Sequence, residues 1–319
     1  MKKFLKVTLK VFGVILAIFA LILATTSIVN AVASGQEADR ITPYGKFSTV
    51  DGKKMNLVTT GDGPETIVLL PGFGTSAPSI DFLPLTEKLA ETHRVVVVEP
   101  FGYGLSDQTE KPRTSENIVT EVHEALHQQG IDRFVLGGHS IAGIYSLNYV
   151  NKYPEDVIAF VGVDTSVPDQ PGMDVSFPID LMRAAKATGI ARAVTALDSD
   201  PLAKFAKDYP EKAREQNTLI VNRNAMSDTY LDEMSRIGAN FADAKARKLT
   251  FPADLPVLLF AQDPNPANPN WLKLHEEQAA HSTHGEVIGM KGDHYLHHTE
   301  SAQIAEDTNR FLAALPGDE

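Results

Sequence analysis

Residues 138–143, Gly-His-Ser-Ile-Ala-Gly, constrain the fold more than any other stretch of this chain. The apolar run before them is typical of a strand, and the apolar residues after them recur at helical spacing. Ser140 therefore falls at a sharp turn from a strand into a helix. Gly138 and Ala142 flank it with small side chains, which such a turn needs because bulky Cβ substituents would collide. The Ser140 hydroxyl projects from this corner, and the backbone N–H of Ile141 is free at the helix start.

Short apolar runs alternate with helical patterns along most of the chain. The run 95–98 consists of valines only, as a strand buried on both faces should. Strands are predicted at 46–50, 54–59, 66–70, 95–98, 133–137, 157–163, 256–261 and 286–290. Helices are predicted at 80–91, 116–129, 144–150 and 302–315. This alternation predicts an α/β fold with a mostly parallel sheet and helices on both of its faces.

One region breaks the alternation. Residues 165–252 contain no convincing strand, and after a proline-rich opening they show helical patterns, as at 181–194 and 211–223. Because the region lies between two predicted strands, we interpret it as a helical cap inserted over the strand ends. The predicted division is an N-terminal segment at 1–36, a core in two parts at 37–166 and 253–319, and the cap at 167–252.

The N-terminal segment has the composition of a membrane anchor. Residues 1–10 contain four lysines, residues 11–36 carry no charge, and 11–29 are almost wholly apolar. About 20 such residues span a bilayer as a helix, and the flanking lysines would stay cytoplasmic. We therefore expect a transmembrane helix with the rest of the chain outside the cytoplasm. The alternative is a signal peptide cleaved near Ala33, where Ala-Val-Ala offers small residues, which would give a secreted protein. A short polar linker is expected at 36–44.

The charge and the lack of cysteine exclude several classes of function. The net charge is −12 although four lysines lie in the first ten residues, so the rest of the chain is more acidic still. Nucleic acids require a basic face, and we expect no nucleic-acid partner. The chain has no cysteine. Disulfides, thiolate metal sites and a cysteine nucleophile are therefore excluded.

Four stretches together resemble the α/β-hydrolase family. The Gly-x-Ser-x-Ala pattern at 138–142 is a relaxed form of the family's Gly-x-Ser-x-Gly turn, which presents a serine nucleophile. Residues 292–294 match the family's Gly-x-His pattern near the C-terminus. Residues 71–73 continue its His-Gly-x pattern, with proline in place of histidine. Residues 99–107 resemble its Asp-x-x-Gly-x-Gly-x-Ser loop, with Glu99 in place of the aspartate.

The resemblance implies the roles of several residues. Ser140 would be the nucleophile and His294 the base, and the backbone N–H groups of Phe73 and Ile141 would form the oxyanion hole. The resemblance leaves two candidates for the acid that orients the histidine. We favour Asp263, which follows the predicted strand 256–261, although the family more often has a glycine three residues before this aspartate. The alternative is Asp164, at the end of strand 157–163, where some members of the family have their acid.

The sequence therefore predicts a membrane-anchored, extracytoplasmic serine hydrolase acting on a carboxylic ester. The substrate would be a small acyl compound, and no cofactor or metal ion is expected. A serine at the turn argues against the dehalogenase and epoxide-hydrolase branches, where an aspartate attacks. Amidase, thioesterase and C–C hydrolase activities stay open. So does a binding or signalling protein that retains the triad with little turnover. Trp271 is expected in a loop beyond Asp263.

Overall fold

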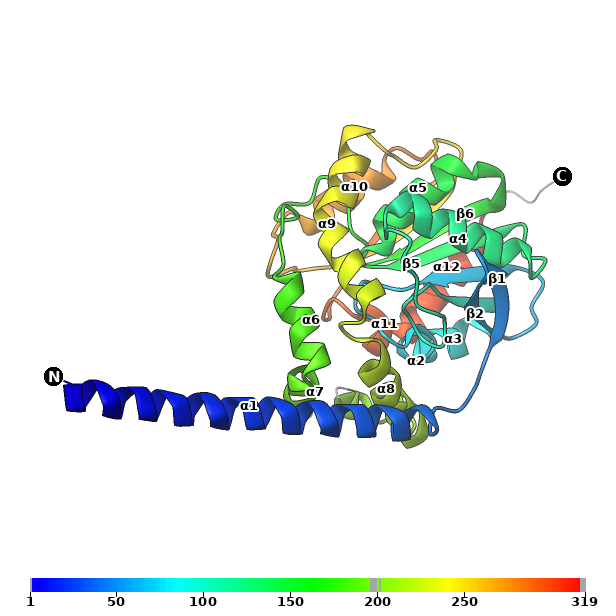
Figure 1. Cartoon of the computed structure of the whole chain (residues 1–319). Helices are drawn as coiled ribbons and strands as arrows, with labels where there is room; N and C mark the ends of the chain where they lie inside the picture. Colours follow the sequence, from blue (N-terminus) through cyan, green and yellow to red (C-terminus); the bar gives the residue numbers. More distant parts are fainter. Residues whose placement is uncertain (1, 196–199, 201, 316–319) are drawn as a thin grey trace.

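The computed structural model describes residues 2–195, 200 and 202–315. The fold is built on an eight-stranded sheet in the order β1-β2-β4-β3-β5-β6-β7-β8 (Figure 1). The strands are β1 (Lys46–Val50), β2 (Lys53–Thr60), β3 (Thr66–Leu70), β4 (Arg94–Glu99), β5 (Phe134–His139), β6 (Val157–Val163), β7 (Val257–Gln262) and β8 (Gly285–Met290). β2 pairs antiparallel with β1 and β4, and all pairs from β4 to β8 are parallel. The predicted α/β fold with a mostly parallel sheet is confirmed.

Helices cover both faces of the sheet because its central strands are apolar on both sides. In β4, Val96 and Val98 join one buried cluster while Val95 and Val97 join the other. The first cluster includes residues of α4 (Ser115–His127) and α5 (Ala142–Lys152). The second includes residues of α3 (Leu83–Leu89) and α12 (Ser301–Ala313). Since successive side chains of a strand point to opposite faces, a run of valines requires a core on each side.

The described residues between β6 and β7 form helices and no strand. These helices are α6 (Ile179–Ala187), α7 (Ile190–Thr195), η3 (Ala203–Phe205), α8 (Glu211–Asn224) and α9 (Asp228–Ala246). They lie in the region predicted as the cap, whose boundaries at 167 and 252 stay predictions. In α9, Glu233 accepts hydrogen bonds from Tyr103 (2.9 Å) and Tyr145 (2.8 Å). This buried carboxylate therefore joins the cap to a core loop and to α5.

Three predicted local details differ from the structure. The helix expected at 80–91 is divided into α2 (Pro78–Asp81) and α3, because Pro84 near the start of α3 has no N–H to continue the first helix. The helix expected at 181–194 is divided into α6 and α7 at Gly189. The φ of Gly189 is 76°, in the left-handed region, so a right-handed helix cannot continue through it. Trp271 does not lie in a loop. It is the first residue of α10 (Trp271–Ala279).

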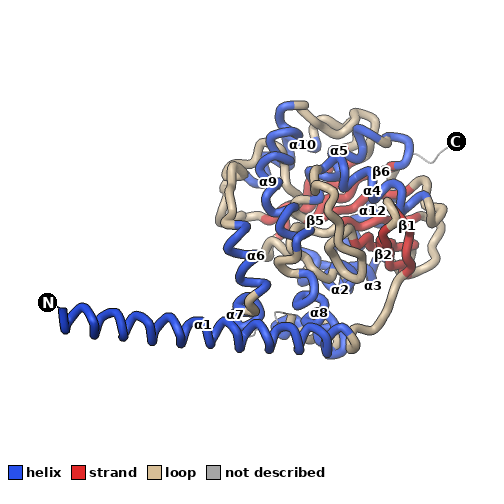
Figure 2. The backbone as a smooth tube through the Cα atoms, viewed as in Figure 1, coloured by secondary structure: helices blue, strands red, loops and turns tan. Residues whose placement is uncertain are grey.

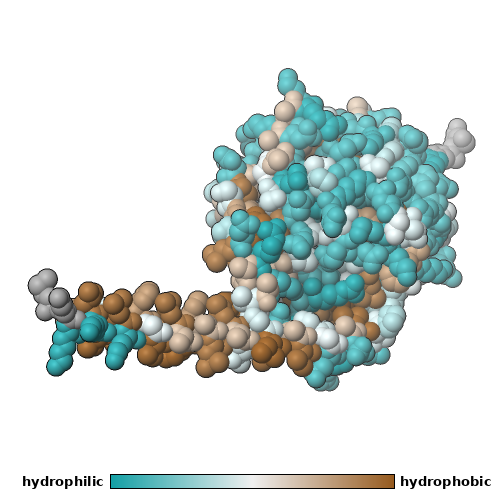
Figure 3. Space-filling view, in the orientation of Figure 1, coloured by the Kyte–Doolittle hydropathy of each residue, from teal (hydrophilic) through white to brown (hydrophobic). Residues whose placement is uncertain are grey.

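The N-terminal segment is one long helix, α1 (Lys2–Ala38) (Figure 1). Apolar side chains are exposed along most of its length (Figure 3). It is long and apolar enough to cross a membrane, a property that a signal sequence shares. Its C-terminal part lies beside α7 and α8 (Figure 2). Arg192 of α7 donates to Asn30 (2.9 Å), Ser34 (2.9 Å) and Glu37 (2.6 Å). The predicted linker is thus shorter than expected, since α1 continues to Ala38.

Candidate active site

The turn after β5 brings Ser140 into a strained backbone conformation. Ser140 has a φ of 57°, in the left-handed region that residues with a Cβ rarely adopt. A Cβ on Gly138 would lie 2.9 Å from the Cβ of Ala142, and one on Gly143 would lie 2.3 Å from the carbonyl oxygen of Ser166. The small residues seen in the sequence are therefore required where β5 and α5 meet.

Ser140, His294 and Asp164 form one hydrogen-bonded line. His294 follows β8, and its Nε2 lies 2.9 Å from Oγ of Ser140. Its Nδ1 lies 2.5 Å from Oδ2 of Asp164. The carboxylate can only accept, so Nδ1 carries the proton and the lone pair of Nε2 faces the serine hydroxyl. A histidine held in this tautomer can accept the serine proton.

Asp164 is held from several sides. It directly follows β6, has a φ of 46° and donates its N–H to the carbonyl of Phe260 (2.7 Å). Its side chain is fully buried. Oδ1 accepts the backbone N–H of Gln262 (2.8 Å) and the indole N–H of Trp271 (2.6 Å). Both oxygens are therefore engaged, one with His294 and the other with these two donors.

The structure places Asp164, and not the favoured Asp263, beside His294. Asp263 is exposed, and its backbone N–H donates to Met290 (2.8 Å). Within residues 2–195, 200 and 202–315, no hydrogen bond joins it to His294. The backbone gives the reason: Asp263 continues the pairing of β7 with β8 and its side chain lies beside Gly289, whereas Asp164 leaves β6 with a φ of 46°. The end of β7 contributes instead Gln262, whose amide donates to the carbonyl of Gly292 (2.7 Å) in the histidine loop.

Trp271 is the residue of this site that sequence reasoning missed. Its contact with Asp164 depends on α10, which is hidden behind the proline- and asparagine-rich run 264–270. The sequence does contain a helical pattern here, because Trp271, His275 and Ala279 recur at intervals of four residues. In the structure all three side chains are buried.

Buried histidines hold the His294 loop against the sheet. Nε2 of His139, the residue before the nucleophile candidate, lies 3.1 Å from the backbone carbonyl of His294. Burial lowers the pKa of His139 well below its usual range, so the ring is neutral and donates one hydrogen bond to this carbonyl. This contact ties the histidine loop directly to the strand that carries Ser140.

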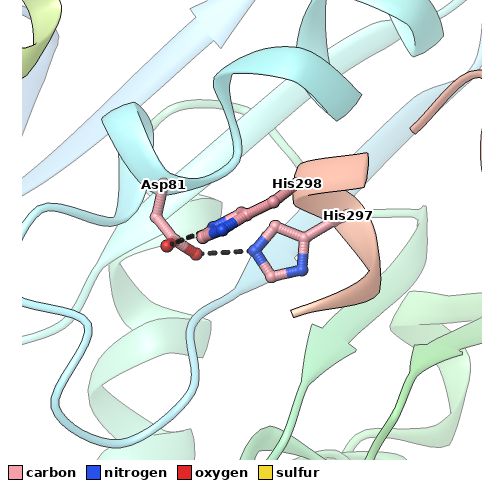
Figure 4. A group of neighbouring side chains, drawn as sticks. All are labelled: Asp81, His297 and His298. Carbon is pink, nitrogen blue, oxygen red and sulfur yellow. Dashed lines mark hydrogen bonds and ion pairs between the residues drawn. The ribbon is translucent and has the colours of Figure 1, made fainter. Parts of the chain in front are cut away.

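A second contact fixes α11 (Leu296–Thr299), which follows this loop (Figure 4). Oδ2 of Asp81 lies 2.7 Å from Nε2 of His297, and Oδ1 lies 2.8 Å from Nε2 of His298. Burial lowers the pKa of His297. Burial opposes ionisation of Asp81, but His297 and His298 outweigh it and hold the pKa of this carboxyl below its usual range. One hydrogen bond to each carboxylate oxygen accounts for the positions of His297 and His298, so no metal ion is needed to explain them.

The loop after β3 lies against the serine turn. A Cβ on Gly72 would lie 2.7 Å from Nδ1 of His139 and 3.0 Å from Cβ of Ser140, so only glycine fits. Neither the N–H of Phe73 nor that of Ile141 donates to a backbone carbonyl in the part of the chain that the structure describes. Two free donors near Ser140 suit an oxyanion. The ring of Phe73 packs against Tyr230 of α9, with centroids 4.8 Å apart, so the cap covers this loop.

A cavity of about 290 Å³ lies between the core and the cap beside the histidine loop. Asp293 and Tyr295, the neighbours of His294, contribute to its wall. Its other lining residues are Gly74, Thr75, Ser76, Ala77, Asp81, Leu202, Lys204, Phe205, Asn217, Val221, His298 and Thr299. Its size suits a small organic molecule.

Comparisons with known proteins agree with this architecture. The model of the alpha/beta hydrolase family matches residues 67–307. The uncharacterized protein YbdG of Bacillus subtilis is 30% identical over 171 residues, which are 53% of this chain and 53% of that protein. Lipase 1 of Psychrobacter immobilis is 30% identical over 126 residues, or 38% of either chain. This chain thus spans about half or less of the length of these curated relatives.

Solved structures share the fold at low identity. Cfl2 from Burkholderia cenocepacia has a TM-score of 0.65 and 21% identity, over 83% of this chain and 94% of that one. Epoxide hydrolase VrEH1 from Vigna radiata has a TM-score of 0.65 and 18% identity, over 85% of this chain and 98% of that one. The match to the family model extends from β3 into α12 and includes Ser140, Asp164 and His294. The chain therefore belongs to the alpha/beta hydrolase family.

Proposed function

We propose that this hydrolase cleaves carboxylic esters through an acyl-enzyme on Ser140. The observation that carries the proposal is the hydrogen-bonded line from Asp164 through His294 to Ser140. Serine hydroxyls are weak nucleophiles until an adjacent base accepts their proton, and a third group must orient that base. In the proposed triad, Asp164 takes the orienting role that the sequence favoured for Asp263.

The proposed reaction has two halves. His294 takes the proton of Ser140 while Oγ attacks the ester carbonyl, and the N–H groups of Phe73 and Ile141 stabilise the resulting oxyanion. His294 then gives the proton to the leaving alkoxide, the C–O bond breaks, and the acyl group stays on Ser140. In the second half His294 takes a proton from a water molecule while the water oxygen attacks the acyl carbonyl. The bond between the acyl carbon and Oγ of Ser140 then breaks, His294 returns the proton to Oγ, and the carboxylic acid leaves.

Two points support an ester as the substrate. The attacking side chain would be a serine, whereas the dehalogenase and epoxide-hydrolase branches attack with an aspartate. One of the relatives is named a lipase. The substrate would lie in the cavity beside Asp293 and Tyr295, with its acyl or alcohol part against the cap.

The location of the enzyme is also a proposal. We propose that α1 anchors the chain in a membrane with the lysines at the cytoplasmic end and the hydrolase domain outside. Protease added to intact cells should then digest the hydrolase domain and leave a membrane-bound fragment. Complete protection of the domain would contradict this topology, and a soluble product starting near Ser34 would show cleavage.

The function is tested with a fluorophosphonate probe and a set of matched substrates. Full-length protein in detergent should be labelled once per chain, and Ser140→Ala should not be labelled. Phenyl esters of increasing acyl length should be hydrolysed, and the matched amide and thioester should be slower. Faster hydrolysis of the amide or the thioester would replace the ester proposal. Labelling of Ser140 without turnover of any substrate would favour a binding protein that retains the triad.

A further inference from the structure

A second group of polar side chains lies at the opposite edge of the sheet from Ser140. His123 and His127 are on the same face of α4, one turn apart. Asp156 ends the short helix η1 (Pro154–Asp156), directly before β6. Ser140 follows the C-terminal end of β5, and β5 and β6 are parallel, so the start of β6 lies far from the proposed triad. These three residues take no part in the proposed hydrolysis.

We propose that His123, His127 and Asp156 bind one divalent transition-metal ion, with zinc as the best match. Each offers one ligand atom, and these atoms all lie within 4.8 Å of one another. Nδ1 of His123 is 2.8 Å and Nε2 of His127 is 3.2 Å from Oδ2 of Asp156. Ligand atoms on a tetrahedral zinc ion are about 3.4 Å apart, so the ion needs shifts of only a few tenths of an ångström.

The number of polar groups around one oxygen of Asp156 favours a bound ion over hydrogen bonds alone. Its Oδ2 faces both histidine nitrogens and also accepts the hydroxyl of Tyr149 at 2.9 Å. A carboxylate oxygen has two lone pairs, which are too few for three separate donors. If one lone pair accepts the Tyr149 hydroxyl, the other can bind a cation that both histidines share.

The surroundings of the three ligands support the same conclusion. Nδ1 of His127 lies 2.8 Å from Oδ1 of Asp132, an arrangement that leaves the Nε2 lone pair for a metal. The ring of His123 is stacked on Tyr153 with centroids 3.7 Å apart, which fixes its orientation. The Asp156 side chain is 3% exposed, but those of His123 and His127 are 23% and 35% exposed. An ion can therefore reach the site and keep a water molecule as its fourth ligand.

The cluster of Asp81, His297 and His298 differs from the proposed zinc site in how the carboxylate oxygens face the histidines. There each histidine faces its own carboxylate oxygen, so both hydrogen bonds can form without competition (Figure 4). At Asp156 both histidines face the same oxygen. The ligand set of two imidazoles and one carboxylate suits zinc, and its position between α4 and the start of β6 separates it from the proposed triad.

Zinc binding by the untagged, full-length protein in detergent tests the proposal. After removal of metal with a chelator, titration should show one zinc ion bound per chain. Zinc at about 100 times its Kd should raise Tm by about 5 °C. Cobalt at the same site should give the visible absorption bands of a tetrahedral ion. Hydrolysis of a phenyl ester should not change with zinc, because the site is remote from Ser140.

Two half-exposed ligands provide variants that preserve the buried carboxylate. His123→Gln and His127→Gln should each weaken zinc binding by at least 100-fold, and Asp132→Asn should weaken it by about 10-fold. The matched control is His281→Gln, an exposed histidine elsewhere, which should bind zinc as the original chain does. Absence of saturable binding to the original chain would overturn the proposal. The proposal would also be overturned if the His123 and His127 variants bound zinc as tightly as the original chain.

Discussion

Replacing Asp164 by asparagine should stop the proposed reaction by fixing His294 in the wrong tautomer. Oδ1 of Asp164 accepts two N–H groups, from Gln262 and Trp271. An asparagine must keep its carbonyl oxygen toward these two donors, so its NH2 group turns toward Nδ1 of His294. Nδ1 then has to accept, and the proton moves to Nε2, which faces Ser140. A protonated Nε2 cannot take the serine proton.

The loss should be large and confined to catalysis. Disruption of the histidine tautomer in serine-protease triads lowers kcat by about 10⁴-fold, which is about 5.5 kcal/mol of transition-state stabilisation. We expect a similar fall in kcat for Asp164→Asn, with KM changed by less than about 3-fold, because the substrate does not contact this buried side chain. The matched control is Asp263→Asn, an exposed aspartate on the neighbouring loop, which should keep kcat within about 3-fold.

The assay is steady-state hydrolysis of one phenyl ester by both variants, with thermal melts to show that each is folded. The reasoning is refuted if the Asp263 variant loses activity by orders of magnitude while the Asp164 variant stays nearly normal. In that case Asp263 would be the orienting acid, as the sequence favoured.

Three further predictions concern the side chains around the site. Trp271→Phe removes one hydrogen-bond donor to the buried carboxylate of Asp164. Because hydrogen bonds to charged groups contribute about 1.5–3 kcal/mol, this variant should have a kcat lower by roughly 10-fold and a nearly constant KM. An unchanged kcat would show that Trp271 does not position Asp164. Asp81→Asn should lower the free energy of unfolding by about 1–3 kcal/mol in urea melts, because an asparagine offers an acceptor oxygen to only one of the two histidines. An unaltered urea melt would show that these hydrogen bonds do not stabilise the fold. The neutral, buried His139 and His297 have pKa values below those of the unfolded chain, so the unfolded chain binds more protons and stability should fall as the pH drops below about 6.5. The loss should approach 1.4 kcal/mol per histidine and pH unit until each folded-state pKa is reached, and equal urea midpoints at pH 7.5 and 5.5 would disprove it.

The sequence predicted the sheet and the serine turn because both depend on local patterns. The valine run of β4 and the small residues around Ser140 can be interpreted without knowing what lies next to them. The choice of acid could not be made in this way. Asp164 and Asp263 both follow parallel strands, so both lie at the same edge of the sheet, and only the backbone path after each strand shows which one reaches His294. The contact of Trp271 with Asp164 is also long-range, since it links two residues from different parts of the chain.

The helix α1 is continuous from its lysine-rich end to the residues that bind the cap. Because Arg192 holds Asn30, Ser34 and Glu37 at once, the cap is fixed to one side of this helix and cannot turn freely around it. An α-helix advances about 1.5 Å and rotates about 100° with each residue. Inserting a single residue before Asn30 would therefore rotate the lysine end by about 100° relative to the cap. The number of residues before Asn30 thus sets the angle between the lysine side chains and the cap around the axis of α1.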